Sequence, residues 1–155
     1  MTLDFSTREA TVADLFSILH HRREMFREMG FTDSAALDAM IASSGPFIRQ
    51  ALTDGSYRGW LAETKRTIAA GAGVLVTPWV SNPRDIQARR AYVLNVYTEP
   101  EYRRLGLSRR LMEVIIDWCR RQGFGTIHLH ASEMGRSLYE SLGFKLSNEM
   151  RLTLK

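Results

Sequence analysis

The sequence predicts a mixed α/β fold in which a central sheet is covered by helices. Two observations indicate this class. Apolar residues recur at helical spacing over residues 15–52 and then alternate at a spacing of two over residues 57–98. A strand, a glycine turn, a helix and another strand follow one another over residues 89–131, which predicts parallel pairing across that helix. At 155 residues the chain is long enough for one domain with a buried core.

The first third of the chain is expected to form a short strand and two helices. Residues 5–9 alternate weakly, which favours a strand, and residues 11–14 have the spacing of a capping box at a helix start. The helical stripe that follows ends at Gly30, a residue type that commonly terminates helices. A second helix is predicted from about residue 33, and Pro46 is expected to end or break it, with another turn or two afterwards.

Two strands joined by a tight turn are predicted next. Residues 57–63 and 67–79 alternate as strands do, and a polar turn is expected at residues 65–66. Gly71 and Gly73 lie within the second strand. We therefore expect a bulge or a close backbone approach there.

The remaining elements alternate between strand and helix. A central strand is predicted over residues 89–98, and the helix after the glycine turn should end at Gly123. A strand over residues 126–131 and a short helix over residues 133–142 follow. Residues 144–154 alternate again and predict a final strand.

Composition narrows the classes of function. The net charge is +4, and only three of the 21 basic residues are lysines, so an anionic ligand is favoured. The chain shows no nucleic-acid motif, no metal-ligand cluster, no signal peptide and no apolar run of roughly 20 residues, so we expect no nucleic acid, no metal and no membrane as partners. A single cysteine, Cys119, excludes an internal disulfide, suits a cytoplasmic location and is interpreted as structural.

The segment of residues 102–112 is the most informative one. Gly106 precedes a strongly amphipathic helix, and a turn of this kind leaves several backbone N–H groups without a partner inside the helix. These donors, the positive end of the helix dipole and the flanking arginines Arg103, Arg104 and Arg109 predict a binding site for a diphosphate.

With these elements in this order, the chain resembles the GNAT superfamily of acyl-CoA-dependent N-acyltransferases. The family's pyrophosphate motif, Gln/Arg-x-x-Gly-x-Gly/Ala, corresponds to residues 103–108, where Ser108 departs from the last position. The later family segment, Asn-x-x-Ala-x-x-Leu-Tyr-x-x-x-Gly-Phe, corresponds to residues 132–144, where Ser132 replaces asparagine and Gly135 replaces alanine. The resemblance implies the acyl-CoA N-acyltransferase fold, a mixed central sheet flanked by helices, as a single domain over residues 1–155.

The resemblance also implies acetyl-CoA as cosubstrate and a set of residues that hold it. Backbone amides of residues 104–109 would bind the diphosphate, and the central strand would pair with the pantetheine arm. A backbone N–H near Val96 would polarise the thioester carbonyl. The residues assigned to acetyl-CoA are Val96, Tyr97, Thr98, Arg103, Arg104, Leu105, Gly106, Leu107, Ser108, Arg109 and Ser132.

Tyr139 is the expected catalytic residue, because the family's tyrosine at this position donates a proton to the departing thiolate. A tyrosine has a pKa near 10 and a cysteine-like thiol a pKa near 8.5, so complete proton transfer from the tyrosine to the thiolate is uphill by roughly 2 kcal/mol. We therefore expect hydrogen-bond donation or a proton relay. Gly135, one turn earlier, would let the thiol approach the phenol.

The general base is less clearly indicated. His130, near the end of a strand, is the candidate we name as base or relay, while the alternative is a histidine that serves packing. Glu24 and Glu28 on the first helix could hold a cation, and His20 and His21 are weaker candidates still.

The predicted function is transfer of an acetyl group from acetyl-CoA to a primary amine of a small molecule or peptide, in a ternary complex. A non-catalytic CoA-binding sensor or partner-binding module on the same fold is the alternative, and nucleic-acid binding through the arginine doublets ranks third. The sequence does not identify the acceptor. A homodimer is an expectation from the family alone.

Overall fold

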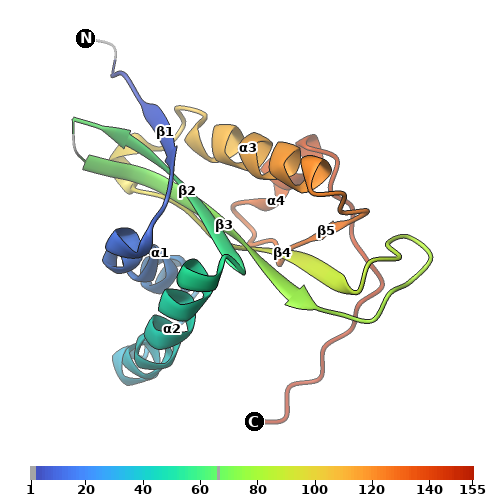
Figure 1. The fold of residues 1–155 in the computed structure, drawn as a ribbon. Coiled ribbons are helices and arrows are strands. Elements are labelled where there is room, and N and C mark those ends of the chain that lie inside the picture. Colours follow the sequence, from blue (N-terminus) through green and yellow to red (C-terminus); the bar gives the residue numbers. More distant parts are fainter. Residues whose placement is uncertain (1–2, 66) are drawn as a thin grey trace.

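A five-stranded sheet forms the centre of the molecule, with strand order β1-β2-β3-β4-β5 (Figure 1). The computed structural model describes residues 3–65 and 67–155, so the second residue of the expected turn at 65–66 lies outside the described residues, as do residues 1–2. The strands are β1 (Ser6–Glu9), β2 (Tyr57–Thr64), β3 (Thr67–Pro78), β4 (Arg89–Thr98) and β5 (Ile127–His128). Strands β1 to β4 pair antiparallel and β4 pairs parallel with β5, which confirms the mixed sheet.

Helices cover both faces of this sheet. Two 3₁₀ turns accompany them, η1 (Val12–Asp14) and η2 (Pro100–Tyr102). Figure 1 shows α1 (Leu15–Glu28) and α2 (Ser34–Asp54) on one face, with α3 (Leu107–Arg121) and α4 (Arg136–Ser141) on the other. Within the described ranges, no helix combines the length and the apolar character that a membrane span requires.

Each face of the sheet has its own apolar core. Leu111, Met112 and Ile115 on the apolar stripe of α3 are fully buried against the sheet. On the opposite face, Ile18 of α1 and Ile48 of α2 are buried together with residues of β2. The helical periodicity of the sequence therefore marks the faces that the helices bury.

The capping box at the start of the first helical segment is confirmed. The Thr11 hydroxyl accepts from the Ala13 amide, and the Asp14 carboxylate accepts from the Thr11 amide at 2.8 Å. Asp14 also receives two hydrogen bonds from Arg8, which hold the pKa of its carboxyl below the ordinary value. This cap anchors β1 to the start of α1.

The prediction that Pro46 ends or breaks the second helix is wrong, because α2 continues as one helix past it. A proline inside a helix removes one backbone hydrogen bond and crowds the preceding turn. Here Ile48 and Ala51, which follow the proline, are buried on the sheet, so tertiary packing maintains the helix.

The expected C-terminal elements are shorter than predicted. Strand β5 covers two residues of the predicted 126–131, because its pairing with β4 is restricted to Ala91 with Ile127 and Tyr92 with His128 before the two strands separate. Helix α4 begins at Arg136 rather than Glu133. The predicted final strand over 144–154 forms no regular element, since it has no partner strand among the described residues.

A bulge occurs where the two glycines of β3 predicted one. The register between β3 and β4 shifts between Gly71 and Gly73. The buried ring of Tyr57 fills the space beside Gly73, where a Cβ atom would lie 2.1 Å from the Tyr57 hydroxyl oxygen. Gly73 is therefore required by the close approach of Tyr57.

We expect Gly73→Ala to lower the free energy of unfolding by about 1–3 kcal/mol, because the new methyl group overlaps a buried ring that cannot leave its site. Urea unfolding followed by circular dichroism measures this. Gly45→Ala in α2 is the matched control. The new Cβ atom would lie 3.6 Å from the Leu19 side chain of α1, an ordinary contact, so the substitution should be neutral or stabilising. Equal stability of the two variants would contradict this account of Gly73.

Candidate functional site

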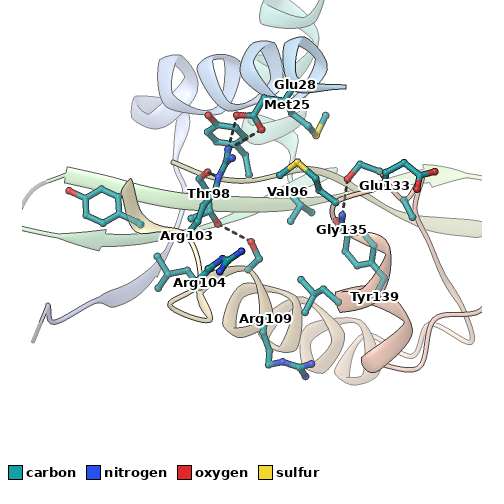
Figure 2. Close-up of a pocket in the computed structure, with 18 of the residues that line it drawn as sticks. Met25, Glu28, Val96, Thr98, Arg103, Arg104, Arg109, Glu133, Gly135 and Tyr139 are labelled. Atoms are coloured by element: carbon teal, nitrogen blue, oxygen red, sulfur yellow. Dashed lines mark hydrogen bonds and ion pairs between the residues drawn. The ribbon is translucent and has the colours of Figure 1, made fainter. Parts of the chain in front are cut away.

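A cleft of about 640 Å³ opens where β4 and β5 separate (Figure 2). Its walls come from α1, the end of β4, the turn before α3, and the loop and helix around α4. The predicted site residues that line it are Val96, Tyr97, Thr98, Arg103, Arg104, Gly106, Leu107, Ser108, Arg109, Ser132 and Tyr139. Leu105 and His130 do not line it. The structure thus brings together residues that are up to 43 positions apart in the sequence.

A bulge at Asn95 shapes the middle of the cleft. Asn95 adopts a left-handed conformation with φ of 57°, and its buried amide donates to the Tyr57 hydroxyl at 3.1 Å and accepts from Arg22 at 3.0 Å. The extra residue reverses the alternation of β4: Leu94 packs toward α1 and α2, whereas Val96 packs toward α3 and lines the cleft. Beyond Tyr92, no described strand pairs with this edge of β4, so its backbone is open to the cleft.

The turn before α3 presents unpaired backbone donors. Arg104 and Gly106 both have positive φ, 63° and 78°, and the glycine adopts this conformation without steric cost. Within the described part of the chain, no backbone hydrogen bond outside the regular elements starts from an amide of residues 104–109, and the Arg110 amide is the first to bond back, to Gly106 at 3.1 Å. Unpaired amides at a helix N-terminus are an arrangement that favours anions.

The arginines around this turn differ in their surroundings. Arg103 is occupied: its guanidinium donates to the Thr98 carbonyl and to both carboxylate oxygens of Glu28, at 2.7 and 2.9 Å. The Arg109 side chain points away from β4 and donates to Ser141 (Figure 2). Arg104 is exposed at the rim of the cleft. The hydroxyls of Thr98 and Ser108 share a hydrogen bond of 2.8 Å, which joins the end of β4 to the start of α3.

Tyr139 closes the other end of the cleft. Its ring is buried on α4, packs edge-on against Phe144, and lies so close to Gly135 that a Cβ there would meet the ring at 2.8 Å. The space beside Gly135 is therefore filled by Tyr139 itself, which corrects the expectation that it would admit the thiol. Burial alone raises the pKa of Tyr139 to about 12. The Ser132 hydroxyl accepts a hydrogen bond of 3.1 Å from the Gly135 amide, which fixes the start of this helix.

The candidate bases lie in different surroundings. Glu28 lines the cleft in its ion pair with Arg103, and Glu24 pairs with Arg27. His130 lies outside the cleft, edge-on to the Tyr92 ring, with its Nε2 atom 3.0 Å from a nitrogen of Arg151. Because an arginine can only donate, that nitrogen of His130 must be unprotonated to accept.

A cluster of polar and aromatic side chains on the α1 side of β4, in which His21 and Tyr97 are buried, was not expected from the sequence. Glu99 accepts from His20 at 2.7 Å and lies 3.8 Å from His21, whose ring packs against Tyr97. Burial, with a smaller contribution from His20, lowers the pKa of His21 to about 4, so the ring is neutral near pH 7. His21 therefore serves packing beneath the cleft.

Other functional features were missed as well. The cleft wall also contains Tyr102, Glu133 and Met134, which hold no defined position in either motif, and Leu138, which stands at the leucine position of the segment over residues 132–144 but was not assigned to the site. Asn95 carried a usable signal, since asparagine tolerates positive φ and is unusual within an otherwise apolar strand. Cys119 is buried in the α3 core, burial raises the pKa of its thiol to about 11, and it does not line the cleft.

Comparison with known proteins gives consistent matches. The sequence model of the acetyltransferase (GNAT) family matches residues 15–144. The crystal structure of a GCN5-related N-acetyltransferase from Ralstonia eutropha JMP134 has a TM-score of 0.92 and 34% identity, covering 97% of this chain and 99% of that one. A protein of Clostridium acetobutylicum described as a predicted acetyltransferase, crystallised with acetyl-CoA, shares the fold with a TM-score of 0.88 and 22% identity, covering 97% of both chains.

Curated relatives match over shorter segments. Human N-acetyltransferase 8 is 28% identical over 97 residues, which are 58% of this chain and 39% of that protein. The [ribosomal protein bS18]-alanine N-acetyltransferase of Escherichia coli K12 is 39% identical over 57 residues, 35% of this chain and 38% of that protein. The match thus spans about two fifths of the length of each curated relative.

The buried ring of His21 predicts a pH dependence of stability. Its pKa is about 4 in the folded protein against an ordinary 6.5, so the unfolded chain binds more protons between these values and the free energy of unfolding falls as pH falls. The loss should approach about 2 kcal/mol near pH 5. Urea unfolding between neutral pH and pH 5 should show this loss, and His21→Gln should reduce it. His20→Gln leaves the buried ring in place and should retain the loss; equal slopes for all three proteins would refute the assignment.

Proposed function

Because the chain belongs to the acetyltransferase (GNAT) family, we propose that it transfers an acetyl group from acetyl-CoA to a primary amine of a small molecule or peptide. The observation that carries the proposal is one cleft that holds unpaired amides at one end, an open strand edge in the middle and a buried tyrosine at the other end. The names of the relatives support N-acetylation, since they include human N-acetyltransferase 8 and an N-acetyltransferase of a ribosomal protein alanine.

The charged groups and amides of the cleft indicate how it would bind acetyl-CoA. The diphosphate of acetyl-CoA would accept hydrogen bonds from the amides of residues 104–109 at the positive end of the α3 dipole. Arg104 is free at the rim to add a positive charge, whereas Arg103 is paired with Glu28 and would position the turn instead. The pantetheine arm would hydrogen-bond to the open edge of β4 between Val96 and Thr98.

The proposed chemistry is direct transfer. The neutral amine attacks the thioester carbonyl carbon, the carbon–nitrogen bond forms, and the backbone N–H near Val96 stabilises the negative oxygen. The carbon–sulfur bond then breaks, the sulfur leaves with the electron pair, and the amine nitrogen loses a proton. With a pKa of about 12 for Tyr139, complete proton transfer to a thiolate would cost about 5 kcal/mol, so its hydroxyl acts as a hydrogen-bond donor to the departing sulfur.

The acceptor amine must lose its proton before it attacks. An amine with a lysine-like pKa near 10.4 is deprotonated at pH 7 at a cost of roughly 4.6 kcal/mol. Both carboxylate oxygens of Glu28 already accept hydrogen bonds from Arg103. His130 stays our proposed base or relay. It lies at the end of the chain segment that extends from β5, so a chain of water molecules would have to connect it to the cleft.

Calorimetric titration with acetyl-CoA should show saturable binding that weakens when the phosphates of the ligand are removed. Arg104→Glu should weaken binding about tenfold, which is about 1.4 kcal/mol, because it reverses a charge beside the free amides. Arg120→Glu makes the same charge change at the exposed far end of α3 and should leave binding unchanged. Absence of binding at millimolar acetyl-CoA would refute the proposed function.

Tyr139→Phe should lower kcat about 10²-fold with little change in the KM for acetyl-CoA, because it removes one transition-state hydrogen-bond donor and keeps the packing of the ring. Release of coenzyme A thiol with a panel of amines measures this. Tyr102→Phe is the matched control, since Tyr102 lines the same cleft but packs against Phe5, whereas Tyr139 packs against Phe144. An unchanged kcat for Tyr139→Phe would remove it from the mechanism, and binding without turnover on any amine would favour a CoA sensor.

A further inference from the structure

The cleft has an apolar wall that is rich in methionine. Met25 lies in the last turn of α1 and Met29 follows that helix directly, so the two are four positions apart and share one face. Both line the cleft, as does Met134 from the loop before α4, and these three residues form a methionine wall. Met29 is 44% exposed and Met134 is 68% exposed, so the chain leaves much of this wall in water. Exposed apolar side chains that line a cleft are typical of a binding surface for an apolar group.

The methionine wall borders the part of the cleft that acetyl-CoA would leave open. Figure 2 shows Met25 and Glu28 on the α1 side of the sheet. Arg104 and Arg109 lie on the α3 side, and Val96 lies between the two groups. The diphosphate would bind at the turn before α3 and the pantetheine arm along β4, which places the thioester near Val96. An acceptor amine would therefore approach the thioester from the side of α1, along the methionine wall.

The acidic residues of the cleft leave a partner for one cation. Glu28 and Glu133 are the acidic residues that line it in the described part of the chain. Both carboxylate oxygens of Glu28 accept from Arg103, and Glu24, one turn earlier on α1, pairs with Arg27. Glu133 is exposed and forms no ion pair with a described residue. A ligand with one ammonium group thus finds a free carboxylate, while further ammonium groups would find none.

We propose that the acceptor is a primary amine attached to an apolar group, with no second positive charge. The substrate class rests on the proposed acetyl transfer, because only that reaction needs an acceptor. The methionine wall would cover the apolar group, and Glu133 would attract the ammonium. Methionine side chains are flexible and polarisable, so the wall should accommodate aliphatic and aromatic groups alike.

The apolar group supplies selectivity that the charge does not. Water and salt screen an exposed ion pair, so Glu133 alone would distinguish poorly between amines. Removal of apolar surface from water stabilises the complex in proportion to the area covered, and it favours acceptors that carry such surface. It also leaves the ammonium free to lose its proton, which tight pairing with a carboxylate would oppose. The neutral amine then gains the acetyl group and gives up one proton, and coenzyme A leaves as the thiol.

Release of coenzyme A thiol with phenethylamine, ethanolamine and spermidine tests the substrate class. Phenethylamine carries one amine on an apolar group, ethanolamine carries one amine without an apolar group, and spermidine carries several amines. The kcat/KM for phenethylamine should exceed that for each of the others by roughly tenfold or more. A smaller difference, or a preference for ethanolamine or spermidine, would overturn the substrate class while acetyl transfer itself stands. Binding of acetyl-CoA without turnover of any amine would overturn the proposed function, and the substrate class with it.

Polar substitution in the methionine wall tests its role. Met25→Gln and Met29→Gln each keep the length of the side chain but place an amide against the apolar group of the acceptor. Each should raise the KM for phenethylamine about tenfold and leave kcat and the KM for acetyl-CoA unchanged, because the contact is the same before and during the reaction. Met150→Gln is the matched control, since Met150 is 94% exposed and does not line the cleft. An unchanged KM for phenethylamine in either variant, or an equal rise for ethanolamine, would overturn the role of the wall.

Discussion

The buried amide of Asn95 is the interaction on which the arrangement of the cleft depends. It joins Tyr57 of β2 and Arg22 of α1 to β4, at a residue whose positive φ inserts the bulge. Tyr57 in turn occupies the space beside Gly73 of β3, so three strands and one helix meet at this point. Because the bulge changes which β4 side chains face α3, and because pairing with β5 ends before it, an open strand edge exists where a regular sheet would be closed.

The parts of the fold that could be predicted from the sequence are those that local periodicity determines. The strand over residues 89–98, the helix that begins after Gly106 and their parallel partner follow from apolar spacing and a glycine turn. Pro46 was misjudged because burial of the following turn outweighs a local preference. The segment after residue 144 has the pattern of a strand, but a strand also needs a neighbour, and the periodicity of a single chain does not say where that neighbour lies.

Like the fold, the candidate site was predictable from the sequence only where a local pattern marks it. A glycine turn with flanking arginines predicted an anion site at this turn, yet the sequence treated Arg103, Arg104 and Arg109 as equivalent. The pairing of Arg103 with Glu28 joins residues 75 positions apart and depends on how α1 packs across β4, which no local pattern encodes. The sequence predicted that Gly135 lies beside Tyr139, but not the reason for the glycine: the Tyr139 ring itself occupies the space that the absent side chain leaves.

Cys119 bears on how turnover of this protein is measured. Its sulfur is enclosed by the core between α3 and the sheet, and with a pKa of about 11 it is almost entirely in the thiol form near neutral pH. Disulfide reagents react with thiolates that they can reach. Added to the folded protein, such a reagent should therefore titrate liberated coenzyme A against a low protein background, whereas the same reagent in denaturant counts one additional sulfur per chain.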